Sequence, residues 1–196
     1  FEADRLEAQD SAAAERLRQR AARLYRRARG HALEALELRH PGFVSALADS
    51  AAPPVLDAAD AGLAYWAAAA WGSWIALAKD DPEIVADLPL VVRLAAQAEA
   101  ADPDWGDGAI GSLRATLEAA RPGGDKALAA RWFDAAIARA AGRSAGAYLA
   151  KAESIALPAG DRAAFESLLR QALAVRDAAG SQRALQNEVM RRRAAW

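Results

Sequence analysis

The chain has 196 residues, which is enough for one domain with a hydrophobic core, and 57 of them are alanine. Its 25 basic and 26 acidic residues nearly cancel, so the overall charge gives no reason to expect nucleic acid or an anionic membrane as a partner. The absence of cysteine excludes disulfides, thiol nucleophiles and thiolate metal sites. Because alanine fills little space, we expect the six tryptophans to fill gaps between closely packed helices.

The first predicted elements are a long helix over 4–38 and a short helical turn over 43–49, with Pro41 between them. Residues 16–29 hold seven arginines and no acid, and residues 191–193 form a smaller basic cluster. We interpret most of these arginines as pointing into water from helix faces. The chain begins at Phe1 rather than Met, which leaves room for a signal peptide or a lipid-bearing cysteine upstream.

The next predicted helix, over 57–78, contains a stretch without any charge from Ala61 to Ala78. Its length suits a membrane span. However, the stretch is mostly alanine, contains Gly62 and Gly72, and lacks the Leu, Ile and Val density of a typical span. We therefore predict a buried helix of a soluble fold.

The aromatic residues of this helix are the strongest candidates for a binding site. At 100° per residue, Trp66 and Trp74 project from one side of the helix, and Trp71 lies at the edge of that arc. Two interpretations remain open: the indoles fill the core, or some of them line a groove or pore for an apolar ligand. The candidate ligand-binding residues are Tyr65, Trp66, Trp71, Trp74 and, near the mouth of the path, Trp105.

A helical turn at 82–86 and helices over 89–101, 106–120 and 125–141 are predicted next, with Asp81 and Asp125 as N-caps. Residues 106–111 match a dinucleotide-binding fingerprint by spacing, but no strand precedes them. Asp102, Asp104 and Asp107 faintly resemble a calcium loop, but Leu113 stands where such a loop needs a bidentate Glu. We therefore predict neither a nucleotide site nor a metal site here.

The last predicted helices span 145–156, 161–175 and 181–195, with Ser144 and Asp161 as N-caps. Residues 142–146 match the nucleophile-elbow pattern of serine hydrolases, which requires a strand before the serine. A predicted helix precedes Ser144 instead, and the two histidines, His31 and His40, lie in and just after the first helix. Because no nucleophile–base pair or metal-ligand set is present, we predict that the chain is not an enzyme and uses no cofactor.

Small and aromatic residues recur in the second helices of successive helix pairs. Ala129, Phe133 and Ala136 have tetratricopeptide spacing, and Ala98 and Ala172 occupy the matching places in the neighbouring pairs. In the first pair, Arg29 stands where a small residue is expected. No segment alternates apolar and polar residues as a strand does.

These patterns predict an all-α fold, a degenerate tetratricopeptide-like solenoid of helical hairpins with a concave groove. We predict one domain over 1–196. Its hairpins are expected at 4–50, 57–101, 106–141 and 145–175, followed by a C-terminal helix at 181–195.

Seven motifs follow one another at consistent spacing between residues 24 and 175. They are HPGF (40–43), YWAAAAWGSW (65–74), KDDPE (79–83), DLP (87–89), DWGDG (104–108), RPGGD (121–125) and GRSAG (142–146). In this order, the motifs resemble the T component of TRAP-associated transport systems, the TatT family of periplasmic tetratricopeptide-repeat lipoproteins.

The resemblance implies a periplasmic accessory protein of a TRAP transporter. It implies a homotrimer whose protomers each carry an apolar pore for a hydrophobic small molecule, and a TRAP-type substrate-binding protein that docks on the trimer. A membrane is expected as a partner only through a lipid anchor upstream of Phe1, and no nucleic acid is expected. The alternative is a generic tetratricopeptide-type scaffold that binds a protein segment and no small molecule.

Overall fold

Helices account for 75% of the chain in this computed structural model, and the described residues, 2–49, 52, 54–177 and 180–196, form no strand. The predicted all-α fold class is therefore confirmed. The chain divides into two compact units, residues 1–102 and 103–196, and each is described by itself. The prediction that they form one repeat domain stays a prediction.

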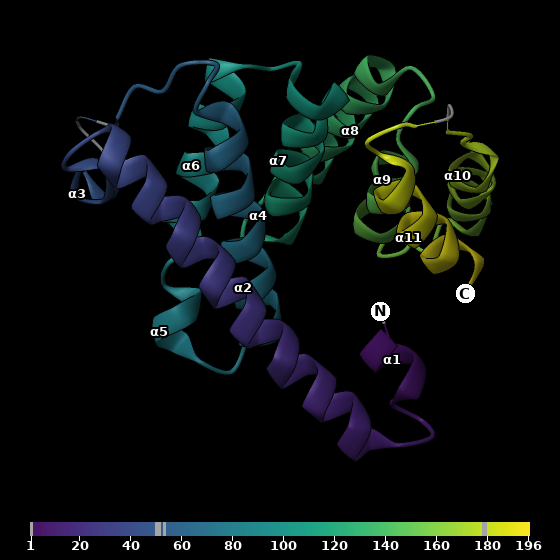
Figure 1. Cartoon of the computed structure of the whole chain (residues 1–196). Coiled ribbons are helices and arrows are strands. Elements are labelled where there is room, and N and C mark those ends of the chain that lie inside the picture. The colour runs from purple at the N-terminus through teal and green to yellow at the C-terminus, as the bar shows by residue number, and fades with distance from the viewer. Residues whose placement is uncertain (1, 50–51, 53, 178–179) are drawn as a thin grey trace. The chain divides into compact units, whose positions relative to one another are not determined.

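In the first unit, the uncharged helix α4 packs between two other helices, α2 and α6. The elements are α1 (Glu2–Leu6), α2 (Ser11–Arg39), α3 (Phe43–Ala48), α4 (Ala61–Leu77), α5 (Pro82–Val85) and α6 (Leu88–Ala101) (Figure 1). Leu36 of α2 and Leu94 of α6 are fully buried, and the buried residues of α4 are mostly alanines. Alanine at these positions lets the helix backbones approach closely.

The predicted helix over 4–38 is wrong at residues 7–10, where the chain breaks into α1 and α2. Asp10 causes the break because its side chain accepts a hydrogen bond from the Ala13 N–H, 2.8 Å away, and so caps the start of α2. Arg18 of α2 then pairs with Asp4 and Glu7, at 3.4 and 2.5 Å, which holds α1 against α2. The predicted end of the first hairpin, residue 50, lies outside the described residues.

The second unit contains a hairpin of α7 and α8. Helix α9 packs against α8, and both α10 and α11 pack against α9. Its elements are η1 (Trp105–Asp107), α7 (Ala109–Ala120), α8 (Lys126–Ala140), α9 (Ala145–Lys151), the π-helical turn η2 (Ala152–Ala156), α10 (Arg162–Ala174) and α11 (Ala184–Ala195). The predicted repeat positions of α8 and α10 are buried: Ala129, Phe133, Ala136 and Ala172. Ala98 of α6 is buried in the first unit as well.

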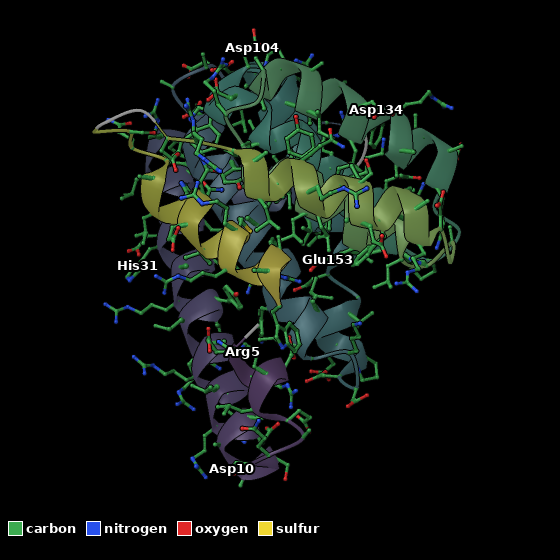
Figure 2. All side chains as sticks on the ribbon, turned by 90° about the vertical axis from the view of Figure 1, so that its right-hand side faces the viewer. Arg5, Asp10, His31, Asp104, Asp134 and Glu153 are labelled. Carbon is green, nitrogen blue, oxygen red and sulfur yellow. The ribbon has the colours of Figure 1, made fainter. Side chains whose placement is uncertain are left out.

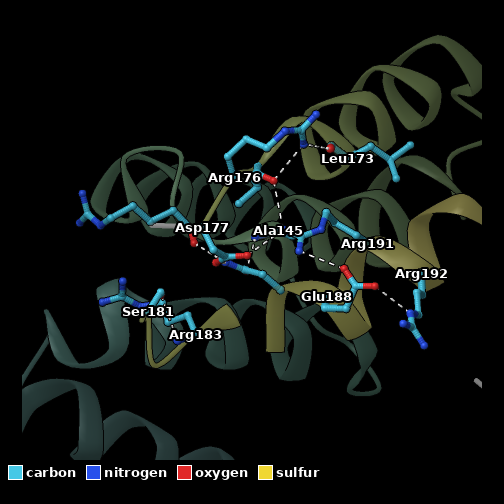
Figure 3. Close-up of polar contacts among 12 residues, drawn as sticks. Ala145, Leu173, Arg176, Asp177, Ser181, Arg183, Glu188, Arg191 and Arg192 are labelled. Carbon is cyan, nitrogen blue, oxygen red and sulfur yellow. Dashed lines mark hydrogen bonds and ion pairs between the residues drawn. The ribbon is translucent and has the colours of Figure 1, made fainter. Parts of the chain in front are cut away.

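A buried asparagine of α11 replaces one predicted helix cap. Ser144 stands at the N-cap of α9, but its side chain makes no capping hydrogen bond. Instead, Oδ1 of Asn187 accepts from the Ala145 N–H at 3.0 Å, and its Nδ2 donates to the Arg143 carbonyl at 2.9 Å and to Asp177 at 2.6 Å (Figure 3). The start of α9 therefore depends on a helix that follows much later in the chain.

Gly30, in the interior of α2, should tolerate a side chain with a gain in stability. A Cβ at this position would meet no atom within 4 Å. Gly30→Ala should raise the free energy of unfolding by about 0.5–1 kcal/mol, because alanine loses less conformational entropy in a helix. Urea denaturation measures this change.

Gly42 is the control for this prediction. A Cβ there also meets nothing within 4 Å, but the residue has a φ of +86°, in the left-handed region. Gly42→Ala should therefore destabilise the protein. A gain at both positions would contradict the explanation by backbone entropy.

Candidate functional site

One side of α4 is uncharged and only partly covered. The buried side of this 17-residue helix packs against α2 and α6. The opposite side, which we call the open face of α4, is half-buried or exposed and consists of Gly62, Trp66, Ala69, Ser73 and Leu77. Their spacing of four, three, four and four residues places them along one side of the helix. This face therefore presents an apolar surface with a single hydroxyl group.

Trp66 is the largest side chain on the open face, and it is 57% exposed. The half-buried Tyr65 ring lies beside it, with ring centroids 5.1 Å apart and planes at 73°, an edge-to-face arrangement. Burial raises the pKa of the Tyr65 phenol, so the phenol is neutral at physiological pH. This pair offers an apolar contact surface without charge.

Trp71 lies on the buried side of the same helix and is only 2% exposed. Its Nε1 donates a hydrogen bond to Oδ2 of Asp87, 3.1 Å away, at the residue that precedes α6. A buried indole with a satisfied N–H is part of the core. Trp74 is half-buried and lies between these two extremes.

Arg29 of α2 brings a positive charge to these indoles. Its guanidinium carbon lies 3.8 Å from the centroid of the Trp71 ring and 5.5 Å from that of Trp74, both cation–π distances. An Nη2 atom of Arg29 lies 3.9 Å from Oδ2 of Asp87. Burial, opposed by the charge of Asp87, lowers the pKa of Arg29, which stays protonated at neutral pH.

The hydrogen-bonding capacity of Arg29 is unused within the described part of the chain. The guanidinium donates no hydrogen bond to another described residue, and its buried Nε has no acceptor. A guanidinium has five N–H donors, so this group can still bind a carboxylate or phosphate that approaches its exposed edge. In the sequence, Arg29 is one of the seven arginines of residues 16–29 and a misfit to the repeat, and no sequence pattern marks Asp87 as the partner of Trp71.

Four of the five predicted site residues therefore lie on α4, and they differ in how far their side chains are exposed. Trp66 is exposed, Tyr65 and Trp74 are half-buried, and Trp71 is buried. Trp105 is half-buried in η1 of the second unit. Its predicted place near the mouth of an apolar ligand path stays a prediction.

A buried carboxylate fixes the start of α4. Asp60 is fully buried, and its carboxylate lies 2.8 Å from His40 Nε2, 2.7 Å from Arg39 Nε and 3.1 Å from the Asp57 N–H. Burial alone raises the pKa of Asp60, but hydrogen bonds from Asp57 and His40, with the charges of His40 and Arg39, hold it below its ordinary value. The cluster joins the end of α2 to the beginning of α4 and so helps to orient the open face.

The lowered pKa of Asp60 predicts an acid-sensitive contribution to stability. Since the folded pKa lies below the unfolded one, the contribution is complete above the unfolded pKa and is lost as pH falls through the folded pKa. Asp60→Asn should lower the free energy of unfolding by about 1.5–3 kcal/mol at about pH 6, and the difference from wild type should shrink below about pH 4. Urea denaturation across this range measures it.

Asp80→Asn, at an exposed aspartate, is the control and should change stability by less than about 0.5 kcal/mol. A difference between Asp60→Asn and wild type that grows as pH falls would contradict the assignment.

No group of three or more His, Asp or Glu residues in the described part of the chain is placed to hold a metal ion. None of the described helices combines the length and the apolar character that crossing a membrane requires. The uncharged stretch from Ala61 is instead a helix packed against α2 and α6.

Comparison with protein families covers the whole chain. The family model of the TRAP transporter T-component, TAtT, matches residues 1–196. The chain belongs to this family. A search of curated proteins finds no match.

Membership makes this TRAP T-component an accessory protein of TRAP transporters. The family implies a periplasmic location, and it is a family of transport accessory proteins rather than a known enzyme family. The resemblance inferred from the motifs between residues 24 and 175 is therefore confirmed, and the match extends over both units.

Proposed function

We propose that this TRAP T-component binds a TRAP-type periplasmic substrate-binding protein and holds an apolar ligand along the open face of α4. It does so as a homotrimer and aids solute import. The observation that carries the proposal is the exposed indole of Trp66 on an uncharged helix face, in a family of transport accessory proteins. A contiguous apolar face that is exposed on a helix is a candidate binding surface.

The surroundings of α4 favour a ligand with an apolar body and an anionic end. The open face offers Trp66 and Leu77, the latter 40% exposed, for the apolar body. At 100° per residue, Trp74 projects between the open face and the buried side of α4, and it lies beside the Arg29 guanidinium, whose N–H groups can bind a carboxylate at the edge of the face. A fatty acid has both features, so it is the probe that tests the proposal.

The ligand test compares dodecanoic acid with dodecanol on the full chain. We expect wild type to bind the acid more tightly than the alcohol, and Arg29→Gln to remove the difference. Trp66→Ala should weaken the binding of both probes. Trp196→Ala, at a tryptophan that is 67% exposed in the second unit, is the matched control and should leave binding unchanged. If wild type binds neither probe, the ligand part of the proposal is wrong.

The partner and the trimer need separate measurements. Light scattering should give about three times the chain mass of 20.7 kDa. Calorimetry with the purified substrate-binding protein of the same transport system should show binding. The absence of both heat and co-elution would contradict the partner. Binding of the partner without binding of either apolar probe would favour the tetratricopeptide-type scaffold instead.

A further inference from the structure

A row of arginines runs along the side of α2 that faces away from its packed side. Arg16, Arg20, Arg23 and Arg27, which we call the arginine stripe, follow at intervals of four, three and four residues. At 100° and 1.5 Å per residue, they lie within about 60° around the helix and extend over about 16 Å. All four are exposed, whereas the buried Leu36 projects from the opposite side.

No acid of the described part of the chain neutralises this stripe. None of its arginines forms an ion pair there, and Arg27 donates only to the ring of His31, at 3.3 Å. The sequence explains this, because no Asp or Glu occurs between Glu15 and Glu34. Figure 2 shows side chains with nitrogen ends projecting from α2 between the labelled His31 and Asp10.

Exposed arginines on two other helices, α10 and α11, are paired with acids. On α10, Arg162 lies 2.6 Å from Glu166, and on α11, Arg192 lies 2.8 Å from Glu188. Arg18, on the other side of α2, pairs with Asp4 of α1 and with Glu7, which follows α1. These exposed arginines of α10 and α11 lie beside acids, whereas those of the stripe, among the described residues, do not.

The stripe also lies in a positively charged segment of a chain whose other residues carry a net negative charge. The formal net charge is −1 and residues 16–29 contribute seven positive charges, so the remaining residues carry −1 − 7 = −8. Like charges three and four residues apart destabilise a helix. A negatively charged partner would remove this repulsion.

We infer that the arginine stripe binds the anionic headgroups of a phospholipid surface. A straight row of guanidinium groups on an exposed helix matches a flat array of lipid phosphates, each of which can accept two N–H bonds from one arginine. Leu24, next to Arg23 and 54% exposed, adds an apolar side chain beside the stripe, as in helices that lie on membranes. The periplasmic location that the family implies places two membranes within reach.

This inference is independent of the ligand and of the protein partner proposed above. It needs no lipid anchor either, because the contact is electrostatic and belongs to residues of the described chain. It therefore predicts a specific dependence on salt and on lipid charge.

The test is sedimentation of the full chain with vesicles of phosphatidylcholine, with or without phosphatidylglycerol. Wild type should bind only the vesicles that contain phosphatidylglycerol, and added salt should release it. The triple variant Arg16→Gln, Arg20→Gln, Arg23→Gln should bind about a hundredfold more weakly, since each arginine near an anionic surface contributes about fivefold. The corresponding triple change to lysine keeps the charge and should retain most of the binding.

The matched control is Arg162→Gln, Arg170→Gln, Arg192→Gln, which removes three charges from exposed positions of α10 and α11. It should bind vesicles almost as wild type does. Circular dichroism checks that each variant is folded. If the triple glutamine variant does not fold, Arg20→Gln and Arg23→Gln are tested singly, with a loss of about fivefold expected from each.

Equal binding of wild type to neutral and anionic vesicles would overturn the inference, and so would an equal loss of binding in the control variant. No binding of wild type to either kind of vesicle would also overturn it. If wild type then binds the substrate-binding protein through the same arginines, the stripe belongs to a contact with an acidic protein surface.

Discussion

Replacing Trp71 by alanine should lower the free energy of unfolding by about 3–5 kcal/mol, whereas Trp66→Ala should lower it by less than about 1 kcal/mol. Trp71 is 2% exposed, and its removal would leave a cavity beneath Arg29 and an unpaired Asp87 acceptor. Trp66 is mostly in water, so its removal leaves no cavity. The two variants change the same residue type on the same helix.

Urea denaturation followed by circular dichroism measures this difference. Trp74→Ala should fall between the two, because its indole is half-buried. Equal losses for Trp66→Ala and Trp71→Ala would contradict the division of α4 into a core side and an open face. The same variants then separate stability from binding, since only Trp66→Ala should weaken the apolar probe without unfolding the protein.

Gly124→Ala should cost about 3–5 kcal/mol, although the change adds a single methyl group. A Cβ on Gly124 would lie 1.9 Å from the backbone carbonyl oxygen of Glu118, which is far too close, so the turn between α7 and α8 would have to move. The movement would also disturb the buried Glu118 carboxylate, which accepts from the Asp125 N–H and from Arg121, both at 2.7 Å. The expected loss combines overpacking with a weakened charge-assisted hydrogen bond.

Gly123→Ala, at the preceding position, is the control. A Cβ there meets nothing within 4 Å, and only the φ of +70° opposes it, so the cost should be about 1–2 kcal/mol. Thermal unfolding of both variants compares the two costs. If Gly123→Ala proved the more damaging change, the clash with Glu118 would not be the dominant effect.

Most helices of this fold can be predicted from the sequence, because alanine-rich periodic segments alternate with proline and glycine. The predicted caps Asp81, Asp125 and Asp161 each accept hydrogen bonds from their helix. The break at Asp10 differs from the predicted continuous helix, and the hydrogen bond from the Ala13 N–H to the Asp10 side chain starts the second helix there. The Ser144 cap failed for a different reason, since its substitute, Asn187, lies far away in the sequence.

The candidate site shows the same division between local and distant information. Helical angles locate the indoles around α4, but they do not reveal which indole other elements cover. Trp71 is covered because Arg29 of α2 and Asp87 before α6 reach it. The one sequence feature that pointed to this contact is Arg29, a large cation at a repeat position where a small residue is expected. Its role follows only from the packing of α2 against α4.

The cap supplied by Asn187 has a consequence for synthesis. The acceptor for the Ala145 N–H lies 42 residues further along the chain, so a ribosome makes α9 long before the residue that secures its first turn. The same side chain binds the Arg143 carbonyl and Asp177. The second unit can therefore complete its folding only after translation has passed α11, and a chain stopped after Gly180 should expose α9 to proteolysis. Until that moment, the first turn of α9 lacks the acceptor that Asn187 supplies in the folded chain.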